Sequence, residues 1–291
     1  RKYLYGTLDD LYPPEAMKGI PEAVSLLLEK IKTGARIRVI GDYDIDGIMA
    51  TYILWEGLKL LGASVDTVIP HRIQDGYGLN EGLIRVAHED GIDTIVTCDN
   101  GIAAYSQIQY ANDLGMTVIV TDHHEVPYDE ESGERVYQIP PAAVVVDPKQ
   151  PDCKYPFSGI CGAVVAMKLV QALFEVYGMG GRKALDIFLE MAAFATVGDV
   201  MELVDENRII VKYGLQALEH SGNPGLCALT EVCELTDRHL SAYHIGFVLG
   251  PCLNATGRLD TAKRALSLLQ CGTRQEALPI ATDLKHLNES R

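Results

Sequence analysis

The segment Val39-Ile40-Gly41-Asp42-Tyr43-Asp44-Ile45-Asp46-Gly47 decides how the first part of this chain folds. A short β-branched run leads directly into three carboxylates at alternate positions, and an apolar helical pattern follows them. Like charges this close repel one another unless cations neutralise them, and oxygen ligands of this kind suit Mg²⁺ or Mn²⁺. A solvated acidic turn would explain the same residues without a metal, whereas a calcium loop lacks its closing acidic ligand. The segment therefore predicts a strand that ends at a divalent-cation site.

Short apolar runs and helical patterns alternate through the first two-thirds of the chain, which is typical of a parallel sheet covered by helices. We expect strands at residues 37–40, 65–69, 94–97, 118–121 and 143–146. Amphipathic helices are expected between them, at residues 48–61, 79–89 and 103–114. The acidic stretch 128–137 is predicted to be an exposed loop. The pattern predicts a doubly wound α/β fold with a mainly parallel five-stranded sheet and helices on both faces.

Helical periodicity replaces the strand signal from about residue 159 onward. The expected helices are 163–177, 183–197, 207–220, 261–269 and 275–287. We therefore expect a sheet part at about 1–158, a helical C-terminal part at about 159–272, and a last helical segment at 273–291.

Two further polar clusters follow predicted strands, Cys98-Asp99-Asn100-Gly101 and Thr121-Asp122-His123-His124. Taken alone, Asp99 is more often a helix N-cap, and a pair of histidines is more often a surface feature. The carboxyl ends of parallel strands, however, meet at the edge where open α/β sheets bind their ligands. The three clusters are therefore expected to form one site.

The bulk composition restricts the class of protein. A formal net charge of -15 argues against a protein that simply coats nucleic acid, because phosphate binding depends on Lys and Arg. Seven scattered cysteines without a C-x-x-C pair indicate neither a disulfide framework nor a structural zinc site. No apolar run is long enough for a membrane span, and the first residues lack the apolar core of a secretory signal, so a cytoplasmic protein is expected.

In their order and spacing the three clusters resemble the first three motifs of the DHH phosphoesterase superfamily, and Asp199 within residues 195–201 matches the fourth. Further segments are similar to the RecJ family of single-strand-specific DNA exonucleases within that superfamily: 69–72, 75–78, 155–159 and 250–259. The resemblance covers nearly the whole chain. It departs at Cys252, where these exonucleases often carry a basic residue.

The resemblance implies two divalent cations, Mn²⁺ or Mg²⁺, which share a water that attacks phosphorus in line. Asp42 and Asp44 would hold one cation, Asp99 would bridge the two, and the other would be held by Asp46, His123 and Asp199. The implied catalytic residues are Asp44, Asp46, Asp99, His123, His124, Asp199 and Arg258. Contacts to the substrate phosphate are expected from His124, Asn254, Arg258 and His244.

Several of these expectations have a plainer structural alternative. Arg258 could instead form an ion pair with Asp260. His71 and Arg72 are weaker candidates for contacts to the substrate phosphate. Tyr43 and Tyr77 either stack a nucleobase or pack in the core.

The implied activity is 5′ to 3′ exonuclease action on single-stranded DNA, in repair and recombination. Residues 1–272 would be the DHH domain, and 273–291 would begin a connector helix to a DHHA1 domain that, like an OB-fold, lies outside this chain. An alternative is a DHH phosphodiesterase acting on short oligonucleotides, cyclic dinucleotides or nucleotide bisphosphates, which fits the acidic composition better. A manganese pyrophosphatase would be expected to carry a histidine within residues 36–41, and an inactive scaffold relative would have lost at least one metal ligand.

Overall fold

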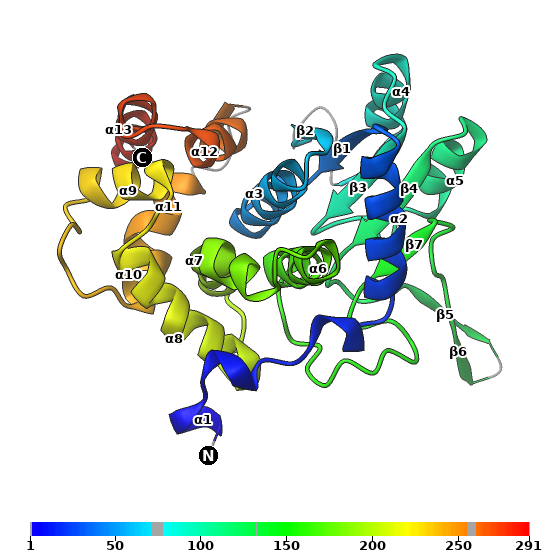
Figure 1. The fold of residues 1–291 in the computed structure, drawn as a ribbon, viewed down its shortest axis with the longest axis horizontal. Helices are drawn as coiled ribbons and strands as arrows, with labels where there is room; N and C mark the ends of the chain where they lie inside the picture. Colours follow the sequence, from blue (N-terminus) through cyan, green and yellow to red (C-terminus); the bar gives the residue numbers. More distant parts are fainter. Residues whose placement is uncertain (1, 71–77, 132, 255–259, 291) are drawn as a thin grey trace.

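A computed structural model describes residues 2–70, 78–131, 133–254 and 260–290. Five parallel strands form the central sheet in the order β2-β1-β3-β4-β7 (Figure 1). Their bounds are β1 (Arg36–Ile40), β2 (Ser64–Val68), β3 (Thr94–Cys98), β4 (Thr117–Thr121) and β7 (Val144–Val146). The predicted doubly wound α/β fold is confirmed, and each expected strand lies within one residue of an observed one.

Helices cover both faces of the sheet because successive residues of each strand point to opposite sides. Val39, Val96 and Ile119 belong to the larger of two apolar cores. Ile95 and Val118 belong to the smaller one. The larger core is covered by α2 (Ile20–Lys32), α3 (Ile45–Leu60) and α6 (Gly162–Tyr177), and the smaller by α4 (Glu81–Glu89) and α5 (Tyr105–Asp113). Burial on both faces explains why the strands are nearly continuous apolar runs.

The helical part of the chain continues the larger core rather than forming a separate one. α6 packs against both α3 and α7, and α7 packs against α8. The last helix packs against α9, α11 and α12 and buries Ala277, Ala281 and Leu284. The elements are α7 (Arg182–Gly198), α8 (Asp205–Glu219), α9 (Pro224–Val232), α10 (Ala242–His244), the π-helical turn η3 (Ile245–Leu249), α11 (Gly250–Leu253), α12 (Asp260–Gln270) and α13 (Arg274–Glu289).

The N-terminal segment runs beneath α6 and α8, with α1 (Lys2–Tyr5) and the 3₁₀ turns η1 (Leu8–Asp10) and η2 (Pro14–Ala16). A buried ion pair fastens it there. Lys168 Nζ lies 2.8 Å from Glu206 Oε1, and both side chains are fully buried. Lys168 also donates to the carbonyl oxygen of Tyr12, whose backbone N–H donates to Glu206. The pair therefore joins the N-terminal segment, α6 and α8 at one buried point.

The prediction of an exposed loop at residues 128–137 was wrong in its secondary structure. β5 (Tyr128–Glu131) and β6 (Glu134–Tyr137) form an antiparallel hairpin, although β6 is exposed throughout. The rings of Tyr128 and Tyr137 lie opposite each other with centroids 5.8 Å apart. Cross-strand aromatic pairs stabilise a hairpin, which explains strands in so acidic a sequence.

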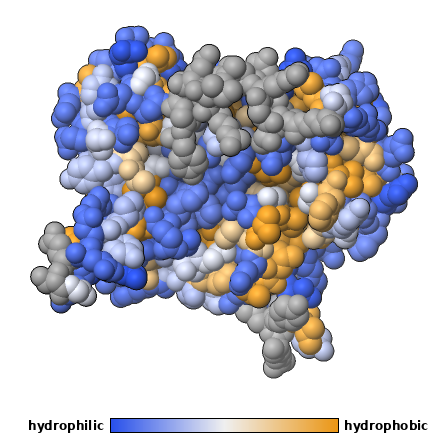
Figure 2. Space-filling view, turned by 180° about the vertical axis from the view of Figure 1, so that it is seen from behind, coloured by the Kyte–Doolittle hydropathy of each residue, from blue (hydrophilic) through white to orange (hydrophobic). Residues whose placement is uncertain are grey.

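The surface divides by polarity. Seen from behind, hydrophilic side chains extend across the middle of the molecule and hydrophobic ones gather beside them (Figure 2). In the part of the chain that the structure describes, no helix is both long and apolar enough to cross a membrane.

Candidate metal centre

The three motif clusters meet at the carboxyl edge of the sheet, because β1, β3 and β4 are parallel neighbours that end there. His123 Nε2 lies 3.0 Å from Asp99 Oδ1 and 3.4 Å from Asp46 Oδ2. Asp199 follows the end of α7 and brings its Oδ2 to 3.9 Å from the same nitrogen. Side chains from four distant points of the sequence thus surround one small volume.

Two groups of side chains in this volume match the ligand sets expected from the sequence. In each group the possible ligand atoms lie within 4.8 Å of one another. One group is Asp42, Asp44 and Asp99, and the other is Asp46, His123 and Asp199. A third combines Asp99 with both histidines, so Asp99 lies where the groups adjoin.

The turn after β1 fixes the first carboxylates. Asp44 caps α3 and accepts a hydrogen bond from the backbone N–H of Gly47 at 2.8 Å. A Cβ at Gly47 would lie 2.5 Å from the carbonyl oxygen of Asp42, so the turn needs glycine there. Asp46 then points away from its own helix. Its two oxygens accept from the backbone N–H groups of Gly162 and Ala163, each at 2.7 Å. The N-terminus of α6, which favours negative charge, therefore orients this carboxylate.

Two positions at the site have strained backbones. Asp99 has φ 59°, in the left-handed region that aspartate tolerates better than most residues. Val200, next to Asp199, has φ 55°, which is unusual for a β-branched side chain. Such strain costs about 1–3 kcal/mol per residue and persists where the surrounding structure imposes it, often at functional sites.

Burial raises the pKa of several carboxyl groups at this site. Burial, with the charge of neighbouring carboxylates, raises the pKa of Asp42 and of Asp199 to about 7. The pKa of Asp99 lies well above its ordinary value for the same reasons. Asp42 Oδ1 is buried, and no described residue donates a hydrogen bond to it. Burial lowers the pKa of His123, which favours the neutral imidazole that a metal requires. The donor set therefore fits hard divalent cations.

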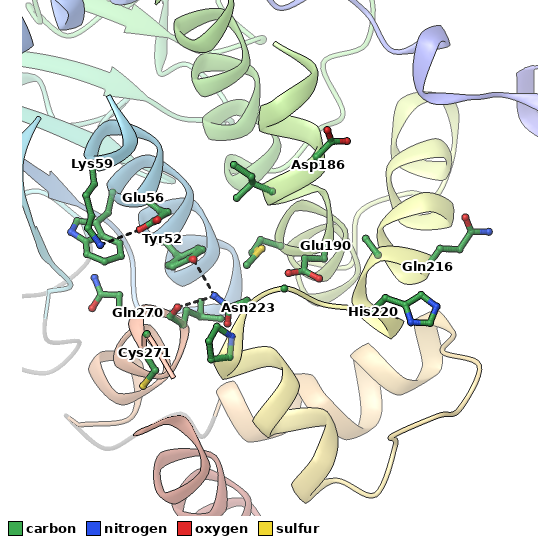
Figure 3. Close-up of a pocket in the computed structure, with 18 residues that line it drawn as sticks. Tyr52, Glu56, Lys59, Asp186, Glu190, Gln216, His220, Asn223, Gln270 and Cys271 are labelled. Carbon is green, nitrogen blue, oxygen red and sulfur yellow. Dashed lines mark hydrogen bonds and ion pairs between the residues drawn. The ribbon is translucent and has the colours of Figure 1, made fainter. Parts of the chain in front are cut away.

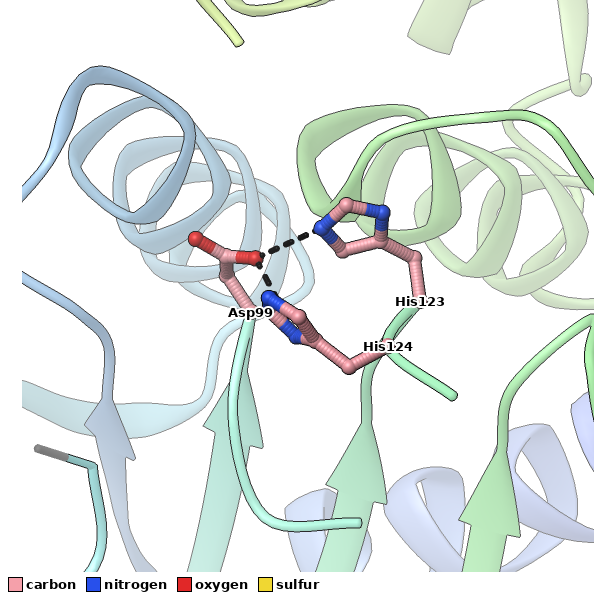
Figure 4. Close-up of side chains that lie close together, drawn as sticks. All are labelled: Asp99, His123 and His124. Atoms are coloured by element: carbon pink, nitrogen blue, oxygen red, sulfur yellow. Dashed lines mark ion pairs between the residues drawn. The ribbon is translucent and has the colours of Figure 1, made fainter. Parts of the chain in front are cut away.

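His123 and His124 both face Asp99 (Figure 4), and Asp122 orients the second histidine. It accepts from the backbone N–H of Ile102 at 2.9 Å and of His123 at 2.8 Å, and its Oδ1 lies 2.6 Å from His124 Nδ1. Burial opposes ionisation of Asp122, but the hydrogen bonds from His124 and the backbone lower its pKa. The same contact raises the pKa of His124, whose side chain is 45% exposed. Asp122 thus orients His124 and favours its protonated form, a role that the sequence analysis did not assign.

The remaining candidates are not members of these ligand groups, and several lie outside the described residues. His71, Arg72, Tyr77 and Arg258 fall in the ranges that the structure does not describe. His244 Nδ1 accepts from the backbone N–H of Ser241 at 3.0 Å and so closes the first turn of α10. Tyr43 is partly buried against the larger core.

Asn254 lies at the end of α11 in a hollow of about 760 Å³. Ile45 and Gly198, which adjoin the metal-site carboxylates in sequence, line the same hollow. Asn254 Oδ1 is buried, and no described residue donates a hydrogen bond to it. This oxygen can only accept a hydrogen bond, so a contact to a substrate phosphate would have to come from the amide nitrogen.

Sequence reasoning missed an aromatic pair in this hollow. The rings of Tyr243 and Phe247 stack with centroids 5.1 Å apart, and the residues are 62% and 72% exposed. The two residues are four apart in sequence, a spacing that places side chains on one face of a helical segment, and the π-helical turn begins between them at Ile245. Asp147 was also missed, although the sequence places it directly after a predicted strand, as it places the other aspartates. In the structure it follows β7 at the same sheet edge and is fully buried.

We expect Gly162→Ala to weaken binding of Mn²⁺ by about 10- to 100-fold, as loss of residues that orient metal ligands does. A Cβ there would lie 2.9 Å from Asp99 Cβ and 3.1 Å from Asp46 Oδ2, so both carboxylates must shift. Calorimetric titration with MnCl₂ measures the effect. Ala166→Gly, in the same helix, is the control for altered helix propensity, and an unchanged affinity in Gly162→Ala would contradict the assignment.

Metal-induced stabilisation should depend on pH. Because the folded-state pKa of Asp42 and Asp199 is raised from 3.8 to about 7, their contribution to metal-free stability is full below about pH 4. It is lost as the pH rises through about 7. A cation requires the ionised carboxylates, so the rise in Tm caused by MnCl₂ should be larger at pH 8 than at pH 6. Thermal unfolding with MnCl₂ or EDTA at both pH values measures it; equal rises would contradict this account.

A parallel α/β sheet with this aspartate and histidine cluster at its carboxyl edge is the architecture of the DHH phosphoesterases. Residues 36–198 match the DHH family, N-terminal domain, and the chain belongs to this family. The predicted similarity to RecJ is also confirmed. The chain is 37% identical over 291 residues to the single-stranded-DNA-specific exonuclease RecJ of Bacillus subtilis, which covers 100% of this chain and 35% of that protein.

Solved structures agree. A crystal structure of exonuclease RecJ bound to manganese matches with a TM-score of 0.81 at 36% identity, covering 94% of this chain and 66% of that one. RecJ of Thermus thermophilus in complex with Mg²⁺ matches with a TM-score of 0.68 at 32% identity, covering 94% of this chain and 35% of that one. The chain thus spans about a third to two-thirds of the length of these relatives.

Proposed function

We propose that this chain is the catalytic part of a metal-dependent exonuclease that degrades single-stranded DNA from 5′ to 3′. The observation that carries the proposal is the pair of adjoining ligand groups at the sheet edge, which contains every expected metal ligand. An inactive scaffold would be expected to lack at least one of them. The similarity to single-stranded-DNA-specific RecJ exonucleases supports the substrate.

The side chains have distinct roles in this proposal. Asp42, Asp44 and Asp99 would hold one divalent cation, Mn²⁺ or Mg²⁺, and Asp46, His123 and Asp199 would hold the other. Bound cations of this kind activate a water for attack and stabilise charge on the phosphate oxygens. The N-terminus of α6 keeps Asp46 aimed at the site.

Contacts to the phosphate would come from groups around the cations. His124, whose protonated form Asp122 favours, would donate a hydrogen bond to a phosphate oxygen. Arg258, Asn254 and His244 are further candidates for this contact. Tyr243 and Phe247 present a ring surface beside the centre, which suits stacking with a nucleobase.

Long DNA would need positive charge that this chain does not supply in excess, given its net charge of -15. Further domains would provide it, and the greater length of the relatives supports this. We propose a DHHA1 domain and an OB-fold, reached through the segment 273–291, with residues 1–272 as the DHH domain. A cytoplasmic location and a role in DNA repair stay predictions.

The acidic composition favours a second candidate, a phosphodiesterase for short oligonucleotides, cyclic dinucleotides or nucleotide bisphosphates. Its substrates carry few phosphates and need no basic groove.

The test is degradation of 5′-labelled and 3′-labelled single-stranded DNA with MnCl₂, by this chain and by the longer protein that contains it, alongside a dinucleotide. We expect the longer protein to release nucleotides from the 5′ end of single strands, and this chain to act more weakly. Cleavage of the dinucleotide alone by both proteins would favour the second candidate, and no hydrolysis by either would refute both.

A further inference from the structure

A second cavity, of about 780 Å³, lies between helices α3, α7, α8, α9 and α12 (Figure 3). Its volume is in the range of small-molecule sites. It contacts the C-terminal half of α3 at Trp55, Glu56 and Lys59, whereas Asp46 is in the first turn of that helix. No described metal-centre residue lines it, so the cavity is a separate feature of the fold.

The cavity has an acidic character. Carboxylates reach it from two helices, Glu56 on α3 and Asp186 and Glu190 on α7. The C-terminal ends of α8 and α12 adjoin it through His220 and Cys271, and helix C-termini carry partial negative charge. Two of these carboxylates already have a cation beside them: Lys59, which stands over the Trp55 ring, lies 3.6 Å from Glu56, and Arg182 lies 3.5 Å from Asp186. Glu190 is therefore the carboxylate of the lining that a bound cation would pair with.

Glu190 is the group that most needs a partner. The residue is 5% exposed and lines the cavity. Its Oε1 accepts from the hydroxyl of Ser221 at 2.8 Å, and no described residue donates a hydrogen bond to Oε2. Burial raises the pKa of Glu190 to about 7, so the group is ionised at pH 8 with a single hydrogen bond. A buried carboxylate in this state gains from an added cation, because buried charges are costly unless paired.

The rest of the lining suits an alkyl chain that carries the charge. Ile187, Met191 and Leu269 supply apolar surface. Trp55 is the one tryptophan in the sequence, and the ammonium of Lys59 lies 4.5 Å from its ring centroid. The ring therefore already accepts an ammonium on one face. One turn earlier in α3, the centroid of the Tyr52 ring lies 6.1 Å from that of Trp55, and the Tyr52 hydroxyl accepts a hydrogen bond from Asn223 at 3.0 Å.

We propose that this cavity binds an alkylammonium group, with the nitrogen at Glu190 and the carbon chain against Trp55 and Met191. The group could belong to a free polyamine or to a lysine side chain of a partner protein, since both present the same chemistry. This inference goes beyond the nuclease function and does not depend on it.

Trp55 fluorescence and calorimetry at pH 8 test the proposal directly. The probes are 1,5-diaminopentane, spermidine, a Gly-Lys-Gly peptide with blocked ends, and pentanol as a neutral analogue. We expect saturable binding of one amine per chain with a change in Trp55 emission, and no binding of pentanol. Tighter binding of the free amines would identify a polyamine site, and tighter binding of the peptide a lysine site.

Two variants separate the cavity from the general acidity of the chain. Glu190→Gln keeps the shape and the Ser221 hydrogen bond and should weaken amine binding at least about 10-fold. Glu130→Gln removes the same charge from the exposed hairpin and should bind as the unaltered chain does. If Glu190→Gln does not fold, calorimetry on Trp55→Leu should show a similar loss. Binding that does not saturate, or that is unchanged in the folded cavity variant, would overturn the proposal.

Discussion

Asp99→Asn should abolish Mn²⁺-dependent hydrolysis while leaving the fold intact. We expect the rate of hydrolysis to fall more than about 100-fold. Loss of a residue that only supports a metal ligand already lowers activity by up to about 100-fold, and Asp99 is a proposed ligand itself. Asp99 adjoins both ligand groups, so its loss should disturb both cations. The metal-free variant should be at least as stable as the unaltered chain, because one buried carboxylate with a strongly raised pKa is removed.

Initial rates on single-stranded DNA and Tm with and without MnCl₂ measure both effects. Asp113→Asn, at the exposed end of α5, is the matched control and should change neither rate nor Tm. A rate within a few-fold of the unaltered enzyme would show that Asp99 is not a ligand.

Lys168→Met should cause the largest loss of stability, about 3–5 kcal/mol in the free energy of unfolding. The substitution leaves Glu206 as a fully buried carboxylate without its cation. It also removes the hydrogen bond to the Tyr12 carbonyl, which helps to hold the N-terminal segment. Urea unfolding measures the loss.

Two comparison variants make this result specific to the buried pair. Lys183→Met removes an exposed lysine from α7 and should change stability by less than about 0.5 kcal/mol. Adding Glu206→Gln to Lys168→Met should recover part of the lost stability, since the unpaired charge is then removed. A loss below about 1 kcal/mol in Lys168→Met would mean that the buried ion pair does not stabilise the junction of the N-terminal segment, α6 and α8.

The sheet and the position of the centre were predictable because both depend on local patterns. Buried parallel strands are short apolar runs, and their carboxyl ends share one edge, so aspartates after β1, β3 and β4 had to meet. α2 was also predictable, with Pro21 in its first turn and buried Ile20, Val24 and Leu27 at helical spacing, but we did not identify it.

Other features depend on contacts that no local pattern contains. Asp46 is oriented by backbone groups of Gly162 and Ala163, more than a hundred residues away in sequence. The contact of His124 with Asp122 leaves the His124 side chain 45% exposed, whereas the His123 side chain is buried among the carboxylates, and the sequence does not show this difference. The π-helical turn at Ile245–Leu249 and the position of Tyr243 and Phe247 in the hollow beside the centre could not be predicted from the local sequence.

The number of Mn²⁺ ions bound per chain tests the central claim most directly. Calorimetric titration with MnCl₂ at pH 8, where Asp42 and Asp199 are ionised, should reveal two sites per chain. Elemental analysis of the saturated, desalted protein should give the same count. A single site, or none, in the folded chain would contradict a two-cation centre at the edge of this sheet.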